Sequence, residues 1–142
     1  MSWIRDRHRA DGATVALSTG TWILSAIAAN DILLTHTFAA GESRRYELIA
    51  LHANVTKVVT TGSKLATLVV KRTRAGASTT LGVTLATTSA NMTPEGAEVI
   101  STRTGGLPDN EIVSGDVVTV VASAATAYVE GEAEFTMILR EI

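Results

Sequence analysis

The chain has 142 residues, of which 46% are hydrophobic and 18% are charged, and its formal net charge is −2. A chain of this length can bury roughly two-thirds of its unfolded surface, so one folded domain is expected. The absence of cysteine excludes disulfides, thiolate zinc sites and cysteine nucleophiles. No apolar run approaches the roughly 20 residues of a membrane span, and the weak negative charge argues against binding to polyanions. We therefore expect neither a membrane nor a nucleic acid as partner.

The N-terminal segment, residues 1–12, is interpreted as a polar arm ahead of a single domain that comprises residues 13–142. A frayed terminus is one reading of such a segment. The other is a docking arm, because Trp and Arg are among the residues that most often carry the energy of an interface. On that hypothesis, two apolar anchors and three carboxylate-binding arginines contact a partner, namely Trp3, Ile4, Arg5, Arg7 and Arg9.

Alternation of apolar and polar residues with a period of two dominates the rest of the chain, which is typical of β-strands with one buried face. One such apolar row is formed by Ile32, Leu34, His36 and Phe38. Gly-, Ser- and Ala-rich turns separate the runs. The predicted strands, in chain order, are 22–28 (with a short helix as the alternative), 32–38, 44–53, 55–60, 65–70, 79–87, 98–101, 117–121 and 128–140.

This pattern predicts an all-β fold, since strands of short and regular spacing are expected and no strong helix is. An antiparallel β-sandwich of jelly-roll type, with about eight strands and an extended N-terminal arm, is the natural architecture. Thr and Ala, at 21 residues each, suit sheets that pack closely or meet in flat subunit contacts. The longest irregular stretch, 88–111, holds both prolines, and loops of this length are usually functional or interaction surfaces.

The stretch 128–140 carries the most distinctive group of carboxylates. Its odd-numbered residues from Val129 to Leu139 are predicted to face the core, and the other face carries Tyr128, Glu130, Glu132 and Glu134. Alternate strand residues lie about 6.6–6.8 Å apart, a spacing that suits the acid pair of an inverting glycosidase. General acid catalysis also needs a buried carboxyl, however, so we interpret the glutamates as a solvated strand face. A cross-strand ladder is one way to offset their repulsion, with Arg44, Arg45, Lys71, Arg72 or Arg74 as partners.

Other chemistry finds little support in the sequence. The histidines His8, His36 and His52 lack a zinc-like partner at i+2 or i+4, and no calcium-loop spacing is present. No G-x-S-x-G motif, phosphate-binding loop or catalytic triad is evident. We therefore expect no cofactor, no metal and no catalytic residue, and a protein that is not an enzyme.

The chain resembles small jelly-roll bacteriophage virion proteins, in particular the head-decoration or cement proteins. The resemblance rests on the short, cysteine-free, Thr- and Ala-rich composition, the polar arm and the closing pair G-D-V-V-T-V-V-A and A-Y-V-E-G-E-A-E-F-T-M-I-L, from Gly115 and Ala127. It implies a homotrimer on the outer capsid surface of the virion that clamps neighbouring copies of the major capsid protein.

The expected function is therefore that of a structural virion protein that binds and stabilises a phage head. Two alternatives remain open. One is a carbohydrate- or receptor-binding jelly-roll module of a phage tail or fibre, which would use the 88–111 loop. The other is a glycan-active enzyme that would use Glu130, Glu132 or Glu134.

Overall fold

The computed structural model describes residues 13–41, 43–94, 96–106 and 109–142. All five residues proposed for the docking arm, Trp3, Ile4, Arg5, Arg7 and Arg9, lie outside the described residues.

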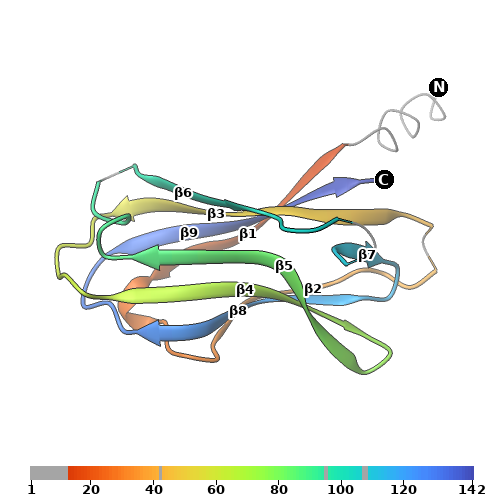
Figure 1. Ribbon diagram of the computed structural model, residues 1–142, viewed down its shortest axis with the longest axis horizontal. Coiled ribbons are helices and arrows are strands. Elements are labelled where there is room, and N and C mark those ends of the chain that lie inside the picture. The colour runs from red at the N-terminus through yellow and green to blue at the C-terminus, as the bar shows by residue number, and fades with distance from the viewer. Residues whose placement is uncertain (1–12, 42, 95, 107–108) are drawn as a thin grey trace.

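The described chain forms two antiparallel sheets that pack face to face (Figure 1). Sheet A has the order β1-β9-β3-β6, and β7 also pairs with β3. Its strands are β1 (Thr14–Ile23), β9 (Glu132–Glu141), β3 (Arg45–Lys57), β6 (Glu98–Thr102) and β7 (Glu111–Val113). Sheet B has the order β2-β8-β4-β5. Its strands are β2 (Ile32–Thr37), β8 (Val117–Thr126), β4 (Leu65–Arg74) and β5 (Ala77–Thr88).

This strand order is that of a jelly roll. Strands β6 and β7 lie along the same edge of β3 and act as two pieces of one edge strand, so each sheet is four strands wide. With this strand order, the connections between the two sheets follow the two Greek keys of a jelly roll. The predicted all-β antiparallel sandwich is confirmed, with nine strands in place of about eight.

The core lies between the sheets and is built from the apolar rows of the long central strands. On β9 the predicted inward set is correct, because Ala133, Phe135, Met137 and Leu139 are all buried. Facing residues from sheet B include Leu68. Alternation along each strand thus places one apolar face against the other, which is the usual origin of a sandwich core.

Sequence analysis did not predict the first strand. In the structure β1 continues through 18–21 as a bulge, with a register shift between Ser18 and Thr21 and a positive φ of 70° at Gly20. The predicted strand 22–28 is wrong for most of its length. Only its first two residues belong to β1, and Leu24–Ala26 form a short 3₁₀ turn, in line with the helical alternative.

Two further strand predictions need correction. The predicted strands 44–53 and 55–60 are parts of the single strand β3, which begins at Arg45 and ends at Lys57, so 58–60 lie outside it. In β2, a register shift between Ile32 and Leu34 breaks the predicted apolar row. As a result Leu33 is buried and Ile32 is 57% exposed.

Candidate functional site

The interior of the sandwich becomes polar at the end where β4 and β5 meet. On β4 the inward positions run through Leu68 and Val70, both fully buried, and continue in the same phase to Arg72 and Arg74. Period-two alternation therefore directs two arginines into the space between the sheets. A charge in such a position is expensive unless it is paired, so its partners decide what the site can do.

Arg74 is paired with Asp116. Its Nε and Nη2 donate to the two carboxylate oxygens of Asp116 at 2.8 Å each, and the N–H of Val113 donates to Asp116 at 2.8 Å. Burial alone would raise the pKa of the Asp116 carboxyl, but these hydrogen bonds and the charges of Arg74 and Arg72 outweigh burial and lower the pKa below its usual value. This bidentate ion pair joins β4 to the turn before β8.

Arg72 is only partly paired. Its Nη1 donates to the backbone carbonyl of Glu111 at 2.6 Å, while the Glu111 carboxylate accepts from Arg45. The Nε of Arg72 is buried and has no hydrogen-bond partner among the described residues. A buried donor without a partner costs free energy, so such a group indicates a place where water or a ligand completes the structure.

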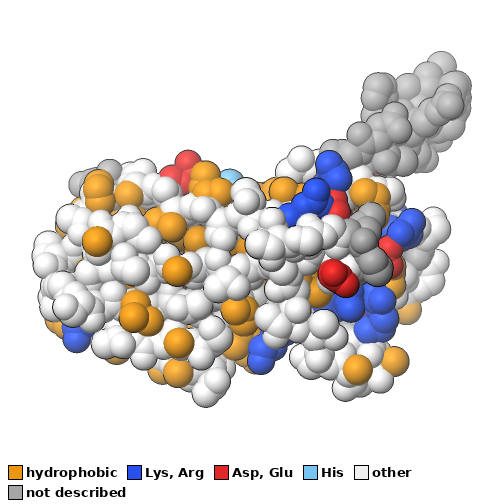
Figure 2. All heavy atoms as spheres, viewed as in Figure 1, with side chains coloured by type: hydrophobic (Ala, Val, Ile, Leu, Met, Phe, Trp, Pro, Cys, Tyr) orange, Lys and Arg blue, Asp and Glu red, His pale blue; other side chains and the backbone are white. Residues whose placement is uncertain are grey.

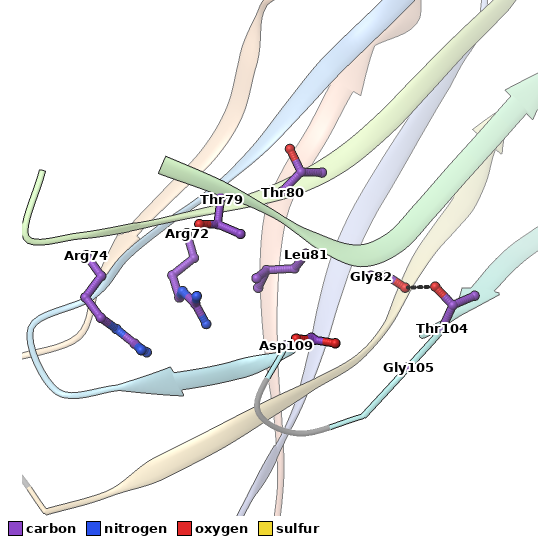
Figure 3. A pocket seen from close by; sticks show the side chains of 9 residues that line it. All are labelled: Arg72, Arg74, Thr79, Thr80, Leu81, Gly82, Thr104, Gly105 and Asp109. Atoms are coloured by element: carbon purple, nitrogen blue, oxygen red, sulfur yellow. Dashed lines mark hydrogen bonds between the residues drawn. The ribbon is translucent and has the colours of Figure 1, made fainter. Parts of the chain in front are cut away.

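A cavity of about 650 Å³ opens beside these arginines. The residues that line it come from β4, β5 and the segment between β6 and β7: Arg72, Arg74, Thr79, Thr80, Leu81, Gly82, Thr104, Gly105 and Asp109. Figure 3 shows the side chains of Arg72, Thr79 and Asp109 directed toward this space, whereas Thr80 points away from it. The volume falls within the range of small-ligand sites.

One rim of the cavity is held by a buried amide. Asn110 is fully buried; its Oδ1 accepts from the N–H of Gly82 at 2.7 Å and its Nδ2 donates to the carbonyl of Thr104 at 3.1 Å. The N–H of Thr104 in turn donates to the carbonyl of Gly82 at 2.6 Å. These bonds fasten Thr104 and Asn110 to β5 at Gly82.

The outward face of sheet B is a second candidate surface. Strand register aligns Ile32, Val121, Val69 and Thr84 in one row across it. The next row contains Thr35, Thr119, Lys71 and Thr80. Figure 2 shows the surface over β4, β5 and β8 with few charged side chains, while most of those in view gather at the end where β7 lies. This face is rich in β-branched residues and carries few charges, and its valines Val69 and Val121 are each only 8% exposed.

The outward face of sheet A is different because it carries carboxylates. Glu134, Asn54 and Glu98 lie in one cross-strand row, and Glu132 lies opposite Lys57. Glu132 pairs with Lys57 at 3.5 Å, Glu134 accepts from the hydroxyl of Ser18 at 2.8 Å, and Glu98 lies 3.4 Å from His52. The outward position predicted for Glu132 and Glu134 is thus correct, but the arginine ladder is wrong, because their partners are Lys57 and Ser18.

Glu130 was placed wrongly on that face. Strand β9 begins only at Glu132, because the preceding Gly131 has a φ of 109° and turns the chain. The alternation therefore reverses before this glycine: Tyr128 is 2% exposed and Val129 is 60% exposed. Glu130 accepts from the N–H groups of Thr60 and Thr61 at 2.6 Å each, so it fixes a turn and does not form an acid pair with Glu132.

The remaining candidates contribute no site within the described residues. His36 packs edge-on against Phe38 with ring centroids 4.7 Å apart, as expected for a histidine near a core. Over 13–41, 43–94, 96–106 and 109–142, no three His, Asp or Glu side chains are placed to hold a metal ion. Within the same ranges no helix has the length and apolarity needed to cross a membrane.

Comparison with known proteins gives a fold likeness only. No family model and no curated protein matches the chain. Two solved structures of infectious bursal disease virus are similar, that of the Gt strain with 10% identity and a TM-score of 0.43, and that of the VP2 subviral particle with 13% and 0.42. Each likeness covers 92% of this chain and 33% of that chain, so this chain spans about a third of their length.

Murine APRIL is similar as well, with 15% identity, a TM-score of 0.38 and coverage of 88% of this chain and 99% of that one. Likenesses at this level include viral and mammalian proteins alike. They therefore carry no argument about what this chain does.

Sequence analysis missed the polar cavity, although a signal for it was present. Arg72 and Arg74 follow Leu68 and Val70 at the same parity, and continuing the alternation past residue 70 would have directed both inward. The predicted strand stopped at Val70 because the apolar run ended there. The contribution of Asp109 and Thr104 could not be read from spacing, since a non-local crossing of the chain brings them to β5.

Proposed function

We propose that the chain is a non-enzymatic structural protein of a virus particle, an oligomeric decoration or cement protein on the outer surface of a phage head. The observation that carries this proposal is the outward face of sheet B. Its rows of Thr and Val side chains, with Lys71 as the charged residue among them, form a flat surface of low desolvation cost. Such a surface suits close contact between rigid copies.

The proposed mechanism is the summation of many small contacts. Copies of the chain associate into a homotrimer through their Thr- and Ala-rich strands. The arm, with Trp3, Ile4, Arg5, Arg7 and Arg9, docks onto the major capsid protein, where the arginines meet carboxylates and the apolar pair fills a pocket. Each copy then bridges neighbouring coat subunits, and occupancy of many equivalent positions stiffens the head.

The chemistry of the cavity is compatible with a non-catalytic role. Arg74 is neutralised by Asp116, and Asp109 is the only carboxylate among the lining residues of this described cavity. General acid–base catalysis on a glycan needs two carboxyl groups across the scissile bond. The glutamates considered for that role lie elsewhere, and Glu130 is bound to the 60–61 turn.

Two measurements test the proposal. Light scattering at micromolar concentration is expected to show a trimer, and co-sedimentation with undecorated heads of the phage that encodes the chain is expected to show saturable binding. Deletion of residues 2–11 is expected to leave the trimer intact and to abolish head binding. A monomer of the full chain, or full head occupancy by the deletion variant, contradicts the respective part of the proposal.

The second candidate function is a carbohydrate- or receptor-binding module of a phage tail or fibre. The cavity favours it, because Thr104, Gly105 and Asp109 belong to the 88–111 loop that the sequence suggested as a binding surface. One variant separates the two functions. Head binding by the arm requires residues 2–11, whereas ligand binding by the cavity does not.

A further inference from the structure

We infer that the cavity at the polar end of the sandwich is a binding site for a carboxylated sugar. Among the described residues, the guanidinium of Arg72 has one hydrogen bond, through Nη1, and no ion pair, and the exposed side chains of Asp109 and Thr79 have no hydrogen-bond or ion-pair partner. Polar groups that converge on one hollow without satisfying each other are the usual mark of a site whose ligand completes the bonding.

The charges around the hollow define the ligand. Arg74 forms an ion pair with Asp116 and Arg45 forms one with Glu111, whereas neither Arg72 nor Asp109 has an ion-pair partner among the described residues. The two lie on different walls, Arg72 on β4 and Asp109 just before β7 (Figure 3). The site is therefore dipolar, with one wall that binds a carboxylate and one that accepts hydrogen bonds from hydroxyl groups.

A sugar acid presents both features on one ring. Its carboxylate would bind the guanidinium of Arg72, for which charge-assisted hydrogen bonds are the strong kind. Its hydroxyls would donate to Asp109 and exchange hydrogen bonds with Thr79. The buried side chain of Leu81 gives an apolar wall for the ring carbons, and Gly82 and Gly105 keep the rim free of side chains.

The position of Arg72 strengthens the inference. A well-packed apolar side chain in an inward strand position is often as stable as a buried ion, so stability alone gives little reason for an arginine there. Glu111 receives only one of its hydrogen bonds, through a backbone carbonyl that any donor would satisfy. Its Nε is buried from solvent, so a ligand in the cavity would bind through Nη2, which has no partner among the described residues.

The test uses a matched pair of probes, methyl glucuronide and methyl glucoside, which differ in the carboxylate. Amide chemical shifts of the ¹⁵N-labelled chain are followed by NMR during titration. We expect saturable shifts at Gly82, Thr104 and Gly105 with the glucuronide at millimolar concentration, and at least about tenfold weaker binding of the glucoside. Equal binding of both probes, no shift with either, or tighter binding of free glycine as a zwitterionic probe overturns the inference.

Variants on one strand supply the control. Arg72→Met is expected to weaken glucuronide binding at least about tenfold, whereas Lys71→Met, which removes the adjacent cation from the outward face, is expected to leave it unchanged. Asp109→Asn keeps the inference testable if Arg72→Met fails to fold, and is expected to weaken binding of both probes. Equal losses in Lys71→Met and Arg72→Met would point to net charge and overturn the site. Head binding is independent of these variants, so its failure concerns the proposed structural role alone.

Discussion

The carboxylate of Glu130 accepts hydrogen bonds from the backbone N–H of Thr61 at 2.6 Å and from the Thr61 hydroxyl at 2.8 Å. Thr60 adds a further N–H donor at 2.6 Å. These bonds, first among them that from the Thr61 N–H, lower the pKa of Glu130 from 4.5 to about 2. The residue therefore ties the turn after β3 to the chain that enters β9, and these hydrogen bonds favour its ionised form.

The first prediction concerns acid stability. Because the folded-state pKa of Glu130 is lowered, its stabilising effect is complete above about pH 4.5 and is lost as the pH falls toward 2. Glu130→Gln should thus lower the melting temperature at pH 7, and the difference from the parent chain should vanish near pH 2. Thermal unfolding followed by circular dichroism between pH 7 and pH 2 measures this.

Glu134→Gln is the matched control, since Glu134 receives one hydrogen bond, from the Ser18 hydroxyl. It should change the melting temperature much less than Glu130→Gln at pH 7. A constant gap between Glu130→Gln and the parent chain at every pH would show that the contact acts through shape and not through charge.

The second prediction concerns the close approach at Gly82. A Cβ built there overlaps the backbone carbonyl oxygen of Thr104 and lies 3.0 Å from the Oδ1 of Asn110. Gly82→Ala must push Thr104 and Asn110 away from β5 and is expected to cost about 1–3 kcal/mol of unfolding free energy, as overpacking usually does. Urea denaturation gives the value directly.

Gly62→Ala is the control for Gly82→Ala, because a Cβ at Gly62 meets no atom within 4 Å. Its effect should stay within about 0.5 kcal/mol of zero. If both substitutions are neutral, Thr104 and Asn110 are not fastened to β5 in the way the hydrogen bonds indicate.

The strands could be predicted from the sequence wherever the alternation is uninterrupted, and the errors occur at backbone irregularities. From Ala133 to Leu139 every inward residue was predicted correctly, since a period of two fixes the face of each side chain. At Gly131 the positive φ shifts the phase, which placed Tyr128 on the wrong side and Glu130 in the wrong role. A glycine on a strand is compatible with either outcome, and only the close packing of Val59 and Leu24 against Gly131, from far along the chain, decides it.

The candidate site was less accessible to sequence reasoning than the fold. Its arginines obey the local alternation and could have been found, whereas Asp116 and Asp109 reach the site from turns that are distant in the chain. The contacts of these two residues depend on how distant turns pack together, which a local sequence pattern does not indicate.

The third prediction concerns the buried hydroxyl of Tyr128. It donates to the Oγ1 of Thr87 at 3.0 Å, and the Thr87 hydroxyl donates to the carbonyl of Ala66 at 2.8 Å. Tyr128→Phe keeps the ring and removes the first of these bonds, so a loss of about 0.5–1.5 kcal/mol is expected. Chemical denaturation measures it, and a stability gain would show that the hydroxyl is better removed than buried.

The fourth prediction tests the oligomer interface. Thr84 lies on the exposed, uncharged face of sheet B in the row of Val69, and Thr136 lies on the outward face of sheet A in the row of His52. If sheet B forms the subunit contact, Thr84→Glu places a charge in a desolvated interface and should convert the trimer to monomer at micromolar concentration. Thr136→Glu should leave the trimer intact, and light scattering of the two variants at equal concentration distinguishes the faces. Each substitution adds the same charge to a strand. Loss of the trimer in Thr136→Glu alone would therefore assign the interface to sheet A. Loss of the trimer in both variants would indicate repulsion from net charge rather than a contact at either face.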